Sequence, residues 1–321
     1  MSLPPLPPDA PGRPGALTRP RRLVPGDTVA VVAPSGPTVP ERLAAGVALL
    51  ESWGLRVRVM PHVLSGHQQL PHLAATDAER AADLRDAWLD PEIAAVVCAR
   101  GGYGAQRMVE LLDWDALRAA PAKVFVGYSD ATALHEAFAL RLGLATLYGP
   151  MAAGQVFTED AATAEHLRRT LFEPERVRLL GSPSAECLVP GRARGATAGG
   201  CLSLLATDRG TPAARPDFAG TILVLEDVGE PLYALDRLLT QLLRSGALAG
   251  VAGVALGSWA DCHPAYRINE LMLDRLGPLG VPVVGELGFG HGPSSLTVPL
   301  GLPALLDADA GTLELELPAL A

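Results

Sequence analysis

Three polar residues each follow an apolar segment of this chain and could together carry covalent chemistry. Ser129 follows KVFVGY, Glu226 follows TILVL, and His291 follows VPVVGELGFG. In open α/β sheets, active sites collect beyond the carboxyl ends of the strands, where all three residues would lie. A hydroxyl, a carboxylate and an imidazole are the nucleophile, the orienting group and the general base of serine catalysis. The three residues therefore predict acyl transfer through a serine nucleophile.

Ser129 lies at a predicted sharp turn from a strand into a helix, within Gly127-Tyr128-Ser129-Asp130. Such a turn exposes the hydroxyl, and the amides of Ser129 and Asp130 open the helix, where unpaired N–H groups favour developing negative charge. The pattern is similar to the nucleophile elbow G-x-S-x-G, but Ala131 replaces the last glycine. From the local sequence alone, a simple helix cap is the alternative role for Ser129.

A glycine pair, Gly101-Gly102, follows the apolar run EIAAVVCAR. Glycine after a parallel strand allows a backbone amide to approach a ligand closely, so this loop is a candidate half of an oxyanion hole. A plain tight turn is the alternative. A dinucleotide-binding loop is disfavoured because the G-x-G-x-x-G spacing is absent.

His291 is the best-placed histidine for a general base, because Gly290 and Gly292 on either side leave its ring accessible. Glu226 is the first residue beyond its strand, where a carboxylate can hold the imidazole tautomer. Glu230, four residues further on, is the alternative carboxylate.

Metal and cofactor sites find little support in the sequence. The spacing of His62, His67 and His72 does not line one face of a helix and is a weak zinc pattern. The only lysine, Lys123, does not belong to a P-loop. We therefore expect neither a metal nor an organic cofactor.

The elements that must position these residues alternate between strand and helix in the first half of the chain. The strands apolar on both faces indicate a mostly parallel sheet covered by helices. Strands are predicted at 27–36, 56–60, 92–100 and 122–128, and helices at 41–54, 77–89, 105–113 and 131–143.

The second half begins again after a quieter stretch that contains one helical pattern, 161–172. Strands are predicted at 221–230, 250–259 and 281–292, helices at 232–246 and 267–277, and short strands within 295–317. We expect a flexible N-terminal arm (1–22), an α/β domain with the nucleophile (23–165), a crossover (166–195) and a smaller α/β domain with the acid and the base (196–321).

Composition limits the classes of partner and location. The chain has 321 residues, of which 49% are hydrophobic, enough for two domains. A net charge of −9 argues against nucleic acid as the main partner. No run approaches the roughly 18 apolar residues of a membrane span, and the first 22 residues lack the apolar core of a signal peptide. Four scattered cysteines suit a reducing compartment, so we expect a cytoplasmic protein.

Several segments, in order along the chain, resemble the LD-carboxypeptidase family. They are RGGYGAQRMVELLDWDALR, VGYSDATALHEAF, LYGPM, GGCLSLLATDRGTP, TILVLEDVGEPLYALDRLLTQLLRSG, GFGHG and LTVPLG. The resemblance extends from about Asp27 to about Leu300. It is closest in outline to murein tetrapeptide carboxypeptidases, with microcin-immunity peptidases as a second branch.

The resemblance implies a two-domain fold whose N-terminal domain looks like class I glutamine amidotransferases. It implies a triad of Ser129, Glu226 and His291, and an oxyanion hole from the amides of Asp130 and Gly102. The implied activity is hydrolysis of an L,D-peptide bond, which releases a terminal D-amino acid from cell-wall peptides through an acyl-enzyme.

A substrate of this kind is a small peptide with a free carboxylate, which a guanidinium can bind through two hydrogen bonds. Arg100 and Arg237 are the candidates, and we expect a homodimer. Two other functions stay open: an amidase acting on peptidyl- or aminoacyl-nucleotides, and a non-catalytic two-domain ligand-binding protein.

Overall fold

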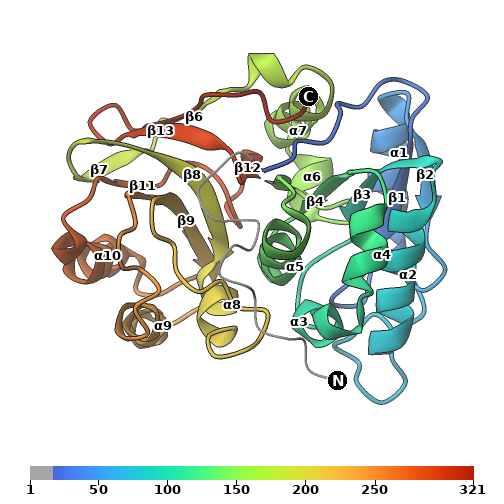
Figure 1. Cartoon of the computed structure of the whole chain (residues 1–321), viewed down its shortest axis with the longest axis horizontal. Coiled ribbons are helices and arrows are strands. Elements are labelled where there is room, and N and C mark those ends of the chain that lie inside the picture. The colour runs from blue at the N-terminus through green and yellow to red at the C-terminus, as the bar shows by residue number, and fades with distance from the viewer. Residues whose placement is uncertain (1–16) are drawn as a thin grey trace.

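A computed structural model describes residues 17–321 as two α/β halves that lie side by side (Figure 1). Each half has its own sheet and its own apolar cluster, and a third cluster joins the two sheets, with Tyr148 and Val298 of the first packed among residues of the second. The predicted two-domain α/β class is therefore confirmed.

The first sheet has six strands in the order β12-β5-β4-β3-β1-β2. All neighbours are parallel except β12, which runs antiparallel to β5. β1 is buried along its whole length, as its continuous apolar sequence predicts. The strands are β1 (Thr28–Val32), β2 (Arg56–Val59), β3 (Ile93–Cys98), β4 (Val124–Gly127), β5 (Thr146–Tyr148) and β12 (Val298–Leu300).

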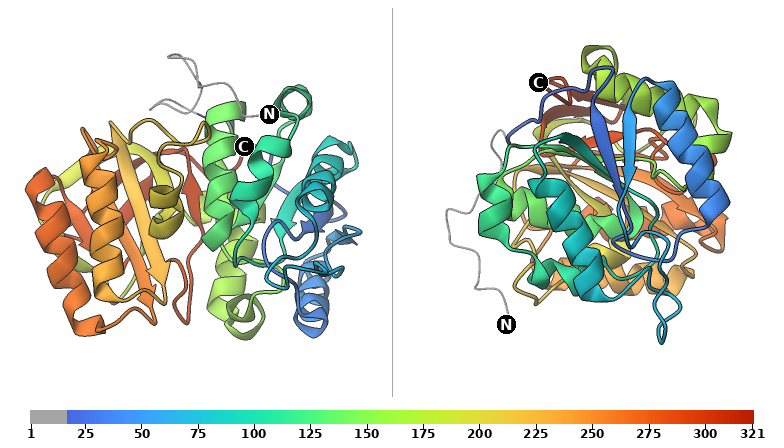
Figure 2. Two further views of the ribbon diagram at one scale, coloured as in Figure 1. Left: turned by 90° about the horizontal axis from the view of Figure 1, so that it is seen from below. Right: turned by 90° about the vertical axis from the view of Figure 1, so that its right-hand side faces the viewer.

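Helices cover this sheet, and α5 (Thr132–Ala137) also packs against β8 (Arg192–Cys201) and α8 (Leu202–Thr207) of the other half. In the left view of Figure 2 the green helices stand between the two halves. The helices are α1 (Pro40–Ser52), α2 (Asp77–Leu89), α3 (Ala105–Met108), α4 (Trp114–Ala119), α5 (Thr132–Ala137), α6 (Gln155–Glu159) and α7 (Ala161–Phe172). The predicted helix at 131–143 is irregular: it starts as a 3-10 turn, η2 (Ser129–Ala131), and ends as a π-turn, η3 (Phe138–Leu142).

The second sheet has eight strands in the order β6-β14-β13-β8-β9-β10-β11-β7, parallel only from β8 to β11. Three helices lie along one face (Figure 1). The elements are β6 (Leu179–Gly181), β7 (Glu186–Val189), β8 (Arg192–Cys201), α8 (Leu202–Thr207), β9 (Thr221–Val228), α9 (Leu232–Arg244), β10 (Gly253–Ala260), α10 (Ile268–Leu276), β11 (Val283–Gly285), β13 (Pro303–Asp307) and β14 (Thr312–Leu315).

Three strands belong to sheets that their place in the sequence does not suggest. β6 and β7 lie within the stretch 166–195, predicted as a crossover, and both join the second sheet. β12 lies within 196–321 but pairs with β5, with Val298 opposite Tyr148. The first sheet is thus completed by a segment that follows most of the second half.

Residues 1–16 of the predicted arm lie outside the described residues, but 17–22 are hydrogen-bonded to the body of the protein. Thr18 donates to Gly143, and the backbone amide of Arg22 donates to the carbonyl of Ala321. Within 17–321, none of the helices is both long and apolar enough to cross a bilayer.

Candidate active site

Ser129 occupies a strained turn directly after β4. Its φ of 62° lies in the left-handed region, which costs a non-glycine residue on the order of 1–3 kcal/mol and is typical of active sites. Gly127 makes this turn fit, because a Cβ there would lie 2.9 Å from both Ala131 Cβ and Cys98 Sγ. The turn has the sharp strand-to-helix geometry expected of a nucleophile.

The Ser129 side chain lines a cavity of about 230 Å³ together with His291. Gly101 forms the wall next to the serine, since a Cβ at this position would lie 2.9 Å from Ser129 Oγ. The remaining lining residues include Val39, Arg42, Arg100, Gly102, Tyr128, Met151 and Gln155. The glycine loop therefore lies directly against the nucleophile.

Glu226 lies within β9, not beyond the strand as the sequence predicted, because pairing with β8 reaches Glu226 and pairing with β10 continues to Val228. It holds His291 through two hydrogen bonds. The Glu226 side chain is 0% exposed, and its Oε2 accepts from His291 Nδ1 at 2.6 Å and from the His291 backbone amide at 3.2 Å. A carboxylate partner assigns the proton to Nδ1 and leaves Nε2 as the basic nitrogen. Gly290 permits this contact, because a Cβ there would lie 2.5 Å from Glu226 Oε2.

Glu230, the alternative acid, lies away from this imidazole. Its backbone amide donates to Cys262 Sγ at 3.4 Å, and its carbonyl accepts from the amide of His263. Of the two carboxylates, the structure brings Glu226 to His291.

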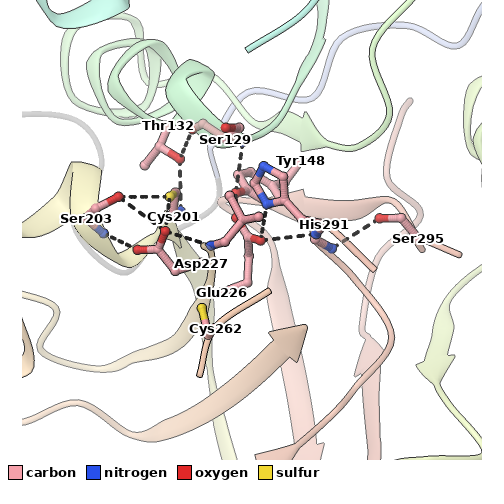
Figure 3. A network of polar contacts seen from close by, with 12 residues as sticks. Ser129, Thr132, Tyr148, Cys201, Ser203, Glu226, Asp227, Cys262, His291 and Ser295 are labelled. Carbon is pink, nitrogen blue, oxygen red and sulfur yellow. Dashed lines mark hydrogen bonds and ion pairs between the residues drawn. The ribbon is translucent and has the colours of Figure 1, made fainter. Parts of the chain in front are cut away.

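Tyr148 on β5 is a site residue that the sequence did not reveal. Its hydroxyl donates to Glu226 Oε1 at 2.6 Å and accepts from the Ser129 amide at 3.1 Å (Figure 3). The Ser129 amide, expected to be unpaired, is therefore occupied. Only its place after a short apolar stretch, in LYGPM, could have drawn attention to this tyrosine.

Asp130 joins the nucleophile turn to the glycine loop. Its carboxylate is buried and accepts from the amide of Ala105 at 2.8 Å, and burial raises its pKa. The side chain of Asp130 thus faces the RGGYG segment, while Gly102 of that segment lines the cavity.

A second polar network ties the nucleophile turn to the other half of the molecule. Thr132 Oγ1 donates to the Ser129 carbonyl at 2.7 Å and accepts from the Cys201 amide at 3.0 Å. Asp227, next to Glu226 on β9, accepts from the Ser203 amide at 2.8 Å, and burial raises the pKa of its carboxyl. These contacts, visible in Figure 3, fix the start of α8 against the site.

The two predicted carboxylate-binding arginines lie in different places. Arg100 lines the cavity, and its guanidinium donates to the carbonyls of Gly101 and Pro37. Arg237 lies on α9 with its guanidinium 5.7 Å from the ring of Tyr233, and it is not among the lining residues. Arg42 on α1, which the sequence did not single out, also lines the cavity.

The three spaced histidines have other partners. His62 Nδ1 lies 2.8 Å from Asp83 Oδ1, His67 Nδ1 accepts from the Leu70 amide, and the His72 ring packs near another aromatic ring. Among residues 17–321, His, Cys, Asp and Glu nowhere form a group of three that could hold a metal ion.

Comparison with known proteins covers both halves of the chain. Residues 29–149 match the LD-carboxypeptidase N-terminal domain, and residues 194–306 match the LD-carboxypeptidase C-terminal domain. A Streptomyces coelicolor protein that carries the name of a carboxypeptidase is 64% identical over 95% of this chain and 98% of its own. The murein tetrapeptide carboxypeptidase of Pseudomonas aeruginosa is 35% identical over 88% of this chain and 93% of its own.

Solved structures agree with this match. Muramoyltetrapeptide carboxypeptidase from Oxalobacter formigenes superposes with a TM-score of 0.76 at 30% identity, covering 90% of this chain and 97% of the other. MccF in complex with glutamyl sulfamoyl guanosine superposes with a TM-score of 0.85 at 23% identity, covering 94% of this chain and 99% of the other. It therefore shares the fold.

Proposed function

The chain belongs to the LD-carboxypeptidase family, and we propose that it is a serine carboxypeptidase that releases the terminal D-amino acid from murein tetrapeptides. The observation that carries this proposal is the contact between Glu226 and His291 beside Ser129 in one cavity. The murein tetrapeptide carboxypeptidases among the relatives support the choice of substrate.

The proposed reaction proceeds through an acyl-enzyme. Ser129 Oγ attacks the scissile carbonyl while its proton passes to His291 Nε2, and the Glu226 carboxylate stabilises the imidazolium that results. The amides of Asp130 and Gly102 hold the oxyanion. His291 then returns the proton to the leaving amine, and a water molecule activated by the same nitrogen hydrolyses the ester.

The terminal carboxylate of the peptide would bind at the cationic end of the cavity. Arg42 and Arg100 both line it, and a guanidinium matches a carboxylate through two parallel hydrogen bonds. Arg237 lies outside this cavity, so we assign the carboxylate to the other two arginines.

Release of D-alanine from a murein tetrapeptide tests the proposal. Ser129→Ala deletes one oxygen and should reduce kcat by up to about 10⁶-fold with an unchanged circular dichroism spectrum. Ser52→Ala, at an exposed serine at the end of α1, is the matched control and should keep full turnover. Wild-type turnover in the Ser129 variant would show that this mechanism is wrong.

A second candidate function comes from the shared fold with MccF, which is known in complex with glutamyl sulfamoyl guanosine. The same site could hydrolyse the acyl bond of an aminoacyl-nucleotide. Parallel assays on the tetrapeptide and on an aminoacyl-sulfamoyl-adenosine separate the two substrates. Labelling of Ser129 by a fluorophosphonate tests the remaining alternative, a non-catalytic binding protein, which should not react. The homodimer and the cytoplasmic location remain predictions from the sequence.

A further inference from the structure

The Tyr148 hydroxyl is hydrogen-bonded to both the nucleophile turn and the acid. The residue is 1% exposed, and its hydroxyl lies between the Ser129 amide at 3.1 Å and Glu226 Oε1 at 2.6 Å. The two partners come from different halves of the molecule, since Ser129 follows β4 and Glu226 lies on β9.

The direction of both hydrogen bonds follows from the chemistry of the groups. A backbone N–H can only donate, so the phenolic oxygen accepts from Ser129, and its single proton is left for the Glu226 carboxylate. Burial and the nearby Glu226 raise the pKa of Tyr148 well above its usual value, so the phenol keeps this proton. Glu226 therefore faces donors only: the Tyr148 hydroxyl on Oε1, and Nδ1 and the amide of His291 on Oε2.

The backbone of Tyr148 adds a third connection. In the antiparallel pair of β5 with β12, Tyr148 lies opposite Val298, which follows the His291 loop by a few residues. One residue is thereby linked to the segments that carry the nucleophile, the acid and the base. Gly200 lets this happen, because a Cβ there would lie 3.0 Å from the Tyr148 ring.

We propose that Tyr148 is a positioning residue, which sets the distance between Ser129 and the Glu226–His291 pair and holds the Glu226 carboxylate in the orientation that faces His291. The proposal rests on the proposed serine mechanism. It has two consequences for that mechanism. The strained turn at Ser129 is held by a hydrogen bond to its amide, and this amide is not available to an oxyanion, which leaves that task to Asp130 and Gly102.

Tyr148→Phe tests the role, because it keeps the buried ring and the strand pairing and removes the hydroxyl alone. We expect kcat for D-alanine release to fall about ten- to a hundredfold, as for loss of one hydrogen bond to a charged group, with KM within about twofold. Tyr266→Phe, at an 81% exposed tyrosine, is the control and should behave as wild type.

The pH profile separates positioning from mere packing. Without the phenol proton, Glu226 carries more effective negative charge and stabilises the His291 imidazolium. The ascending, acid limb of kcat/KM should therefore move to higher pH in the Phe variant. The other ionisable groups near this cluster, namely Asp227, Cys201, Tyr128, Arg100 and His135, are the same in both proteins. A lower melting temperature with an unmoved acid limb would overturn the proposal.

A double-mutant cycle with Glu226→Gln gives a second test. If Tyr148 acts through Glu226, adding Tyr148→Phe to Glu226→Gln should slow turnover by no more than about threefold. Full additivity would overturn the role. Both tests are repeated with the rate of fluorophosphonate labelling of Ser129, which needs no peptide. If the wild-type protein is labelled but releases no D-alanine, the proposed substrate is wrong. The labelling rates of the wild-type protein and the Tyr148→Phe variant would still decide whether Tyr148 positions the site.

Discussion

At the scale of single residues, Glu226 and Glu230 differ in surroundings although only four positions separate them. Glu226→Gln should lower kcat on the order of 10⁴-fold, by analogy with the amide variant of a serine-protease triad, because an amide donor facing Nδ1 selects the wrong imidazole tautomer. Glu230 precedes α9, where a carboxylate favours the helix dipole, so Glu230→Gln should cost only about 0.3–1 kcal/mol of stability.

Steady-state kinetics and thermal melts of the two glutamine variants check this assignment. Glu226→Gln should melt close to wild type, and Glu230→Gln should turn over normally. The reverse pattern would move the acid to Glu230, and equally mild effects would leave a Ser–His pair without a carboxylate.

Gly101 is a second residue whose identity the site demands. Gly101→Ala places a Cβ 2.9 Å from both Cβ and Oγ of Ser129, closer than such atoms approach, so the loop or the nucleophile must shift. A displacement of this size at reacting atoms is expected to cost about 10²-fold in kcat. Gly277→Ala is the control, because its φ of −54° suits alanine and its nearest neighbour atom is 3.4 Å away. Equal activity of the two variants would show that Gly101 tolerates a side chain.

Some of these residues could be found from the sequence because they come directly after apolar runs, although Glu226 lies within β9 and a loop separates His291 from β11. Ser129, Glu226 and His291 each follow an apolar run, and such runs are visible without a structure. Tyr148 could not be found in this way, because its role depends on the meeting of three distant segments. Arg42 was missed because nothing in the sequence distinguishes it from the many other arginines of the chain. Only the fold brings it to the cavity.

At the scale of elements, the long apolar strands were predictable but β8 was not. Its sequence, RARGATAGGC, shows neither alternation nor an apolar run. The glycines have a physical reason: Gly199 and Gly200 have φ values of 122° and 146°, and a Cβ on Gly200 would lie 2.6 Å from Thr132 Oγ1. β8 can pass this close to the site only because it contains these glycines, and the same glycines hide the strand in the sequence.

The element α5 carries a buried histidine that should make stability depend on pH. His135 lies between the Gly127 carbonyl and Thr146 Oγ1, and burial lowers its pKa from 6.5 to about 4. The unfolded chain therefore takes up this proton at higher pH than the folded protein. Stability should fall as pH drops from about 6.5 to 4, with a contribution from His135 of about 3 kcal/mol.

Urea unfolding at several pH values measures this contribution. His135→Gln removes the titrating group, so the loss of stability between pH 6.5 and 4 should be smaller in the variant, whatever its absolute stability. An identical pH dependence in both proteins would contradict the assignment of a buried neutral imidazole.

At the scale of the whole molecule, a buried ion pair joins the two halves. Arg215, in the connection between α8 and β9, donates from Nε to Glu136 of α5 at 2.6 Å, and both side chains are 6% exposed. Arg215→Met leaves a buried carboxylate without this partner and should cost about 3–5 kcal/mol in the free energy of unfolding. The double variant with Glu136→Leu should recover much of the loss.

The exposed pair Arg267–Glu270 provides the control for that measurement. Arg267→Met should change the free energy of unfolding by less than about 1 kcal/mol, because this pair is solvated. If the two methionine variants were equally stable, the interface between the halves would not depend on the Arg215 contact.

The two-domain organisation was predictable from the restart of the strand–helix alternation, but the exchange of β12 was not. Pairing between segments as distant as 146–148 and 298–300 leaves no local pattern, because nothing in the three residues of β12 distinguishes it from the tail strands that join the second sheet.

The place of β12 also has a consequence for the order in which the protein becomes active. A ribosome releases Ser129 and its strained turn long before it releases the strand that closes the first sheet, and the segment bearing His291 emerges just ahead of that strand. Until then the growing chain holds a nucleophile without its base, and the edge of β5 stays unpaired. Reactivity is thereby withheld until the segment from His291 to β12 has been synthesised, so that a chain terminated before that segment carries the serine but not the means to activate it.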